Sequence, residues 1–168
     1  LTGQWGFLKF SELGEENFNR LCLRLLRAEV SLDVQPTNKV GRDNKCDAFL
    51  LPGENKYGLD GLWWFQFKFR DHGRNDNTKL KNKFKTEIIK ELDEVVEKEN
   101  LPNNYVVITP IELSGKDWTD WFQENVINKY SSKISIIRIW DFSKINSLLD
   151  QYSDVKYDFE KIFAQGQI

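Results

Sequence analysis

The chain has 168 residues, 40% of them hydrophobic, which predicts one globular domain with a substantial core. Its net charge of −2 gives no overall attraction to nucleic acid, so any such binding must come from a local basic patch. The two cysteines lack Cys-x-x-Cys spacing and accompany a single histidine, which excludes a zinc site built from these ligands and favours reduced cytosolic thiols.

The sequence also carries expectations about location and completeness. It contains no run of about 18 apolar residues and no signal-peptide pattern, so we expect a soluble, cytoplasmic protein that does not cross a membrane. The chain starts at Leu1 and contains no methionine, which indicates a fragment of a longer protein.

Hydrophobic periodicity in the first half predicts one helix followed by three strands. Apolar residues at helical spacing predict a helix over residues 14–29 with one buried face. Alternation of apolar and polar residues predicts a first strand over 30–34. Strands over 47–51 and 62–69, separated by a glycine-rich turn, complete a three-stranded meander.

The second half predicts alternating helices and strands. A long helix opens at Asn77 or Thr78 and ends before Pro102, with the acidic residues of its second half facing solvent or a partner: Glu87, Glu91, Asp93, Glu94 and Glu97. The apolar run 105–109 predicts a central strand parallel to 62–69, reached by a right-handed crossover. A helix over 114–130, a strand over 134–140, a helix from Asp141 or Ser143 to Leu149 and a last amphipathic turn over 157–163 follow. The predicted fold class is α/β, a central mixed β-sheet flanked by helices in the order α-β-β-β-α-β-α-β.

Polar residues with metal-binding chemistry interrupt two of these strands. In the strand 62–69 the alternate phenylalanines share one face, whereas Gln66 and Lys68 share the other. A hairpin would bring Asp47 towards both. Carboxylate and amide oxygens are ligands for Mg²⁺, which leaves positions for a substrate phosphate. Lys68 could orient or deprotonate a water on the metal and offset phosphate charge, so the trio predicts a phosphodiester hydrolase.

This arrangement, Asp47, a spacer and Gln66-x-Lys68 within an apolar strand, resembles the PD-(D/E)xK nuclease superfamily. It is similar to the branch of Mrr-like type IV restriction endonucleases, in which Gln replaces the second acidic residue. The lead-in Gly41-x-Asp43-x-x-x-Asp47 also resembles that branch, and Asp43 is a second-tier site candidate. The resemblance covers Phe18 to about Thr109 and implies that residues 1–168 form a single Mrr-like nuclease domain with a restriction-endonuclease-like core.

The resemblance implies a Mg²⁺-dependent endonuclease acting on double-stranded DNA, with Mn²⁺ able to substitute. The implied metal ligands are Asp47, Gln66 and the backbone carbonyl of Phe67, and the lysine of the motif would activate water. Family members tend to carry Glu in the helix before the first strand, where this chain has Asn19. Glu16, one turn earlier, could substitute as an auxiliary catalytic acid.

The same resemblance implies a set of partners. Mrr-like nucleases often form the effector domain of longer restriction or antiphage-defence proteins, in which a sensor or NTPase portion controls oligomerisation. We therefore expect double-stranded DNA, a homo-oligomer in the active state, and the rest of a larger chain as partners.

Cations outnumber anions directly after the predicted catalytic strand, by six to two over residues 70–85. Such an excess beside a metal site would suit phosphate-backbone contacts, although a solvated loop and helix face gives the same pattern. The candidate DNA-binding residues are Arg70, Arg74, Lys79, Lys81 and Lys83. His72, in the same stretch, is expected as a solvent-exposed turn residue.

Two other interpretations remain open. The chain could be a catalytically silent nucleic-acid-binding or oligomerisation module on the same fold. The pattern could also arise by chance in a structural core, in which case Asp47, Gln66 and Lys68 would not converge in space. A lysine within so apolar a strand requires a partner, and Asp47 is the expected one.

Overall fold

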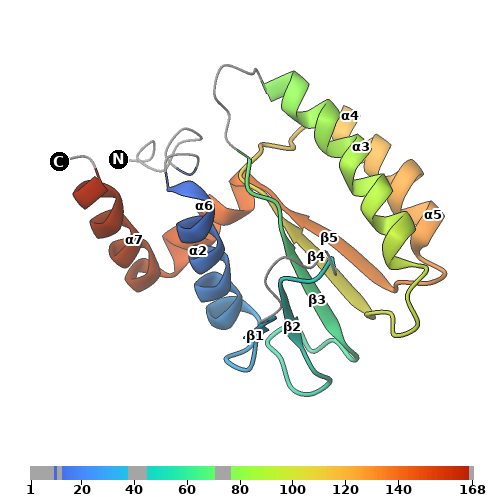
Figure 1. The fold of residues 1–168 in the computed structure, drawn as a ribbon, viewed down its shortest axis with the longest axis horizontal. Coiled ribbons are helices and arrows are strands. Elements are labelled where there is room, and N and C mark those ends of the chain that lie inside the picture. Colours follow the sequence, from blue (N-terminus) through green and yellow to red (C-terminus); the bar gives the residue numbers. More distant parts are fainter. Residues whose placement is uncertain (1–9, 11–12, 38–44, 71–76, 167–168) are drawn as a thin grey trace.

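The computed structural model describes residues 10, 13–37, 45–70 and 77–166, with side chains described as far as Lys161. These residues form an α/β protein in which a five-stranded mixed sheet is flanked by five helices (Figure 1). None of the helices in these ranges combines the length and the hydrophobicity that crossing a membrane requires.

The sheet has the strand order β1-β2-β3-β4-β5. Its strands are β1 (Gln35–Pro36), β2 (Ala48–Leu50), β3 (Trp63–Phe67), β4 (Asn104–Ile108) and β5 (Ile136–Trp140). The first three pair antiparallel, and β3, β4 and β5 pair parallel. This confirms the predicted hairpin of 47–51 with 62–69 and the parallel pairing of the two central strands.

The predicted first strand over 30–34 is wrong, because those residues form turns and β1 begins at Gln35. Val30 and Val34 are buried, whereas Leu32 and Asp33 between them are exposed. Two buried valines that anchor successive turns produce the same alternation as a half-buried strand. Periodicity over five residues therefore did not distinguish the two structures.

The helices follow the predicted order. They are α2 (Gly14–Glu29), α3 (Asn77–Val95), a continuous α4 (Lys116–Phe122), η1 (Gln123–Ile127) and α5 (Asn128–Tyr130), then α6 (Phe142–Gln151) and α7 (Ser153–Gly166). Asp141 caps α6 by accepting a hydrogen bond from the backbone N–H of Lys144 (3.1 Å). The last helix is longer than the turn predicted over 157–163.

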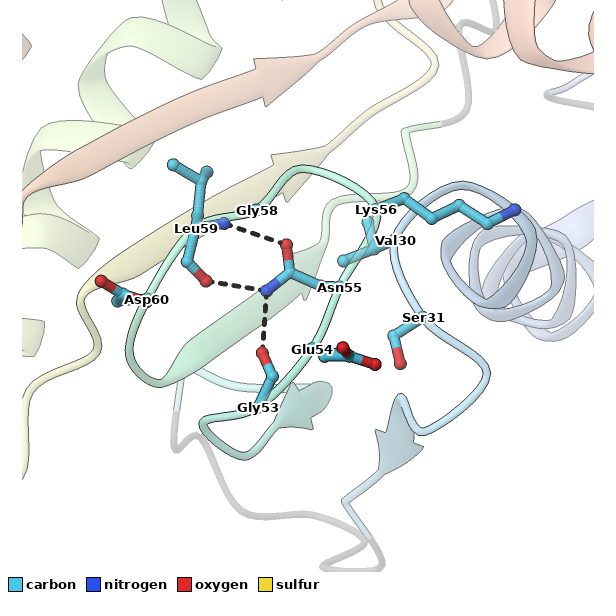
Figure 2. Close-up of a pocket in the computed structure, with 9 residues that line it drawn as sticks. All are labelled: Val30, Ser31, Gly53, Glu54, Asn55, Lys56, Gly58, Leu59 and Asp60. Carbon is cyan, nitrogen blue, oxygen red and sulfur yellow. Dashed lines mark hydrogen bonds between the residues drawn. The ribbon is translucent and has the colours of Figure 1, made fainter.

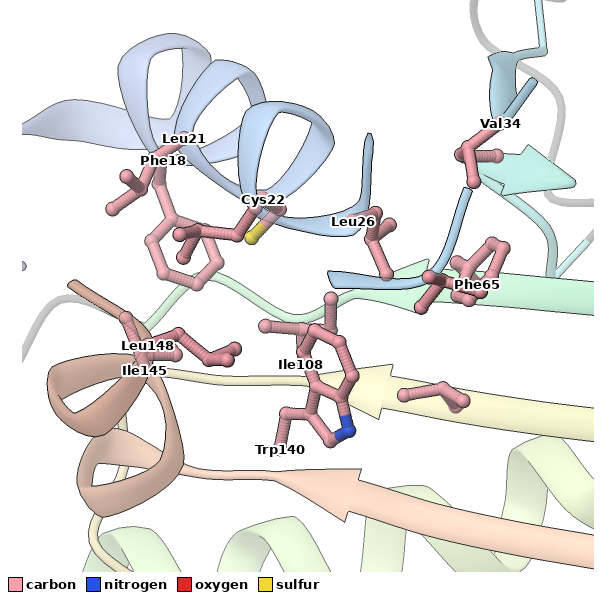
Figure 3. Packing of buried hydrophobic residues seen from close by; sticks show 14 of the residues in the cluster. Phe18, Leu21, Cys22, Leu26, Val34, Phe65, Ile108, Trp140, Ile145 and Leu148 are labelled. Atoms are coloured by element: carbon pink, nitrogen blue, oxygen red, sulfur yellow. The ribbon is translucent and has the colours of Figure 1, made fainter. Parts of the chain in front are cut away.

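Two hydrophobic clusters cover the two faces of the sheet. Helices α2, α6 and α7 lie over one face, and α3 with α4–α5 lies over the other (Figure 1). In the first cluster, side chains of α2 and α6 point towards Phe65, Ile108 and Trp140 on the strands (Figure 3). All five residues of β4 are buried, as expected for a central strand covered on both sides.

Strand β3 divides its side chains between these clusters. Trp63 and Phe65 belong to the cluster beneath α2, and Trp64 packs against the cluster beneath α3. Because side chains alternate along a strand, Gln66 and Lys68 share the face of Trp64 and lie beneath α3. The fold thus places the Gln-x-Lys pair in the α3 layer, at the carboxyl end of β3.

Candidate functional site

Asp47 lies where β2 begins and separates from β3. Its backbone N–H donates to the Phe65 carbonyl on β3 (2.7 Å), while its carbonyl accepts from Thr37, just beyond β1 (2.9 Å). In a regular antiparallel strand, the N–H and the carbonyl of one residue bond to the same neighbouring strand. Those of Asp47 bond to two different segments, so the backbone is twisted here as in a β-bulge. The Asp47 carboxylate Oδ2 accepts a hydrogen bond from the Phe67 N–H (2.7 Å). The hairpin therefore brings Asp47 against the backbone between Gln66 and Lys68.

Gln66, the residue before Phe67, carries a side-chain oxygen without a partner among the described residues. Gln66 is only 8% exposed, and its Oε1 has no hydrogen-bond partner among the described residues. A buried acceptor without a partner costs about 1–3 kcal/mol, so such an atom usually meets a water, an ion or a ligand.

The donor set near Asp47 fits Mg²⁺ rather than a metal that needs a full protein cage. Within the described residues, no group of three or more His, Cys, Asp or Glu side chains is assembled to hold a metal. Mg²⁺ needs only one or two carboxylates because it keeps several waters. The Asp47 carboxylate, the buried Gln66 amide oxygen and a backbone carbonyl are oxygen donors of the kinds that Mg²⁺ takes.

Lys68 forms an ion pair with Glu91 of α3, a partner that the sequence alone did not predict. The Lys68 side chain is 15% exposed and that of Glu91 is 7% exposed. The expectation that Glu91 faces solvent or a partner is therefore wrong, because Glu91 is buried inside the domain. Glu91 stands three residues after Ile88 and four before Val95, both buried, and this spacing on the apolar stripe could have indicated its burial.

Two further ion pairs join the same helix to the strands. Arg70, just after β3, pairs with Glu87, which was also expected to face solvent or a partner. Lys45, just before β2, is buried and pairs with Glu94 (3.0 Å). The three glutamates recur at intervals of four and three residues, so they lie along one side of α3. This side of α3 thus faces the cations around the candidate site.

The first turns of α2 reach the same edge of the sheet. The rings of Phe18 and Phe69 lie 5.6 Å apart. Burial lowers the pKa of the Arg70 guanidinium, and the nearby Glu15 carboxylate opposes that shift. Glu16 is exposed in this first turn, whereas Asn19 has a buried Oδ1 without a partner among the described residues. The candidate site is therefore bordered by α2 on one side and α3 on the other.

The two cysteines near Asp47 remain protonated thiols at neutral pH. Burial raises the pKa of Cys22 well above its ordinary value, and the Asp47 carboxylate raises it further. Burial likewise raises the pKa of Cys46 to about 12, with a smaller contribution from Asp47. Neutral thiols are poor nucleophiles and poor metal ligands, so neither cysteine competes with the carboxylate for this role.

The predicted DNA-binding residues differ in their exposure and in the contacts of their side chains. Lys79 and Lys83 are exposed on the first turns of α3, and Lys81 lies 3.4 Å from the Ser114 carbonyl. The guanidinium of Arg70 is engaged by Glu87. The predicted residues Asp43, His72 and Arg74 lie outside the described residues.

The start of α3 lies near the carboxyl end of the parallel strands. The Asn77 amide donates to the carbonyl of Glu112, which follows β4 (3.1 Å). The lysines of the first turns of α3 therefore lie at the end of the sheet that also carries Lys68. In open α/β sheets, ligands bind outside the carboxyl ends of the strands.

A pocket elsewhere in the molecule does not contain these residues. It is lined by the loop before β3 and by Val30 and Ser31 after α2 (Figure 2). Asn55 in its wall donates to the carbonyl of Leu59 (2.7 Å) and accepts from the N–H of the same residue (3.2 Å). This amide thus stabilises the loop, and it lies at the opposite end of β3 from Lys68.

No protein-family model matches the chain, and neither the curated proteins nor the solved structures contain a match to it.

Proposed function

We propose that this chain is a Mg²⁺-dependent endonuclease domain with a restriction-endonuclease-like core that hydrolyses phosphodiester bonds of double-stranded DNA. The observation that carries the proposal is the hydrogen bond from the Phe67 N–H to the Asp47 carboxylate. It holds a carboxylate against the segment of backbone that carries the unpartnered Gln66 oxygen and the Lys68 ammonium.

Each residue has a distinct role in this proposal. Asp47, Gln66 and the Phe67 carbonyl would hold Mg²⁺ or Mn²⁺, which when bound supplies Lewis-acid stabilisation of charge on the scissile phosphate. The Lys68 ammonium offsets phosphate charge and orients the attacking water. Glu16, exposed in the first turn of α2, is the auxiliary acid.

The lysines of α3 supply sequence-independent affinity. Lys79 and Lys83 are exposed at the end of the sheet that carries Lys68, and Lys81 lies between them in sequence. Lysine contacts with phosphates position a duplex without reading its bases. We propose further that the active state is a homo-oligomer within a restriction or antiphage-defence protein, because two sites are needed to cut two strands.

A catalytically silent DNA-binding or assembly module is the second candidate. It is favoured by the partners that the charged groups already have, namely the Phe67 N–H for Asp47 and Glu91 for Lys68. A site whose polar groups satisfy one another can persist for structural reasons alone.

A cleavage assay separates these two functions. Supercoiled plasmid and linear duplex are incubated with the protein at high concentration in Mg²⁺, Mn²⁺ or EDTA, beside Asp47→Asn, Lys68→Ala and the control Lys116→Ala. Lys116 is exposed on α4 and pairs only locally, with Asp120, so its removal should leave cleavage unchanged. Melting temperatures accompany the rates because Lys68→Ala leaves Glu91 buried without its cation.

The nuclease predicts metal-dependent cleavage that falls by about 10²–10⁴-fold in folded Asp47→Asn and Lys68→Ala proteins. DNA binding without cleavage, even with Mn²⁺ and enforced dimerisation, would instead establish the silent module.

A further inference from the structure

The Lys68–Glu91 ion pair is the most enclosed of the three described ion pairs that join α3 to residues flanking β2 and β3. Neither of its side chains is more than 15% exposed, whereas the Glu94 side chain that pairs with Lys45 is 46% exposed. Glu91 also keeps a buried Oε2 without a partner among the described residues. The pair therefore lies in a desolvated environment, where its electrostatic attraction is strong.

Attachment of α3 to the sheet does not explain why this position is charged. The helix already buries Leu80, Phe84, Ile88, Leu92 and Val95 against the sheet. Replacing a buried ion pair with apolar side chains of similar volume is often neutral or stabilising, because both ions lose their hydration. What a carboxylate does provide is a fixed place for the ammonium.

That place is next to the candidate catalytic carboxylate. Lys68 follows Phe67, whose N–H is bonded to Asp47, and the Lys68 N–H is itself fixed to the Ile108 carbonyl on β4 (2.7 Å). The backbone is thus held on both sides, and Glu91 fixes the far end of the side chain. Groups whose orientation is set before substrate binds require less reorganisation in the transition state.

We propose that Glu91 is a positioning residue of this site, which holds the charged Lys68 ammonium in its productive location without contacting the substrate. This inference rests on the proposed nuclease function. It adds a residue from α3 to a site that otherwise draws on the hairpin and on α2.

The test compares plasmid cleavage by Glu91→Gln, Glu91→Asp and Glu94→Gln with that of the wild-type protein, with circular dichroism to verify folding. Glu94→Gln is the matched control, because it removes an α3 carboxylate from another buried lysine. We expect Glu91→Gln to lower kcat by about tenfold or more while KM changes less than about twofold, since positioning acts on the chemical step. Glu91→Asp keeps the charge and should recover part of kcat, and Glu94→Gln should stay within about twofold of wild type.

The outcomes separate this inference from the proposed function. A wild-type protein that does not cleave DNA would overturn both. Wild-type cleavage that is lost in Asp47→Asn but keeps its kcat in folded Glu91→Gln would overturn the role of Glu91 alone. If Glu91→Gln does not fold, Glu91→Asp provides the test. The shorter aspartate moves the carboxylate away from Lys68, so kcat must fall if positioning is important. An unchanged kcat would contradict the inference.

Discussion

Asp47 has a structural task in addition to its proposed chemical one. Its carboxylate accepts a hydrogen bond from the Phe67 N–H beside the start of β2, so a part-buried backbone donor depends on this side chain. Asp47→Ala removes the acceptor and should lower the free energy of unfolding by about 1–3 kcal/mol. Asp47→Asn keeps an amide oxygen and should retain most of that stability.

Urea unfolding of the two variants measures this difference. Equal destabilisation of Asp47→Asn and Asp47→Ala would contradict the prediction, because it would show that the acceptor oxygen at position 47 does not determine the loss of stability. The comparison also prepares the cleavage assays, since a stable Asp47→Asn protein changes the charge of the site and little else.

At this scale the sequence predicted Gln66 and Lys68 on one strand face, because alternation along a strand fixes which side chains are neighbours. It did not predict Glu91 as a partner of Lys68. The pairing with Glu91 joins residues on two elements, and its location depends on how α3 lies across the sheet. Local periodicity contains no such information. Only the position of Glu91 within the apolar stripe hinted that it was buried.

The turn that leads into β3 depends on a glycine. Gly61 has a φ of +95°, and a Cβ there would lie 2.3 Å from Asn103 Oδ1, the atom that accepts the Leu62 N–H (3.0 Å). Gly61→Ala should therefore cost about 1–3 kcal/mol through backbone strain and displacement of that acceptor. Gly53→Ala is the matched control, because no atom lies within 4 Å of its added Cβ, and it should stay within about 0.5 kcal/mol of wild type.

Thermal or urea unfolding of the two alanine variants checks this prediction. If Gly61→Ala is as stable as Gly53→Ala, the entry into β3 is less constrained than its geometry indicates.

The elements themselves could largely be predicted from the sequence where they are long. The helix over 14–29 and the apolar strand near 105–109 have enough repeats for their periods to be unambiguous. The two-residue strand β1 is too short for any period, and its pairing with β2 comes from the tertiary structure. The same limit explains why turns over 30–34 resembled a strand.

Glu29 links three parts of the chain through hydrogen bonds. Glu29 at the end of α2 accepts from the hydroxyls of Tyr57 in the loop before β3 (2.6 Å) and Tyr152 between α6 and α7 (2.8 Å). Burial raises the pKa of both phenols, and the hydrogen bond to Glu29 raises each further, to about 12 for Tyr152. These contacts depend on protonated tyrosines.

The stability of the fold should therefore decrease in alkali. In the unfolded chain Tyr152 releases its proton near its ordinary pKa of 10.0, whereas in the folded protein it holds the proton to about pH 12. Its contribution is fully present below pH 10 and is lost as the pH rises towards 12. Urea unfolding at pH 8, 10 and 11 measures this loss. Tyr152→Phe is the control and should show a shallower decrease, while an identical slope in both proteins would contradict this assignment.

The charge distribution of the whole molecule also shapes the proposed function. Because the net charge is −2, the proposed binding of DNA requires the lysines at one end of the sheet, where three α3 glutamates also pair with Lys45, Lys68 and Arg70. Lysine contacts with phosphates are lost in salt through counterion competition. Activity should accordingly be highest at low ionic strength, where binding does not limit the assay.

The most direct test of the proposed nuclease function is the initial rate of plasmid cleavage by Asp47→Asn relative to wild type, measured in Mg²⁺ at low salt with unfolding curves for both proteins. If Asp47 holds the metal, the folded variant should bind DNA and cleave at least about 10²-fold more slowly. Cleavage by folded Asp47→Asn at the wild-type rate would contradict it, because the carboxylate between Gln66 and Lys68 would then have no part in the chemistry.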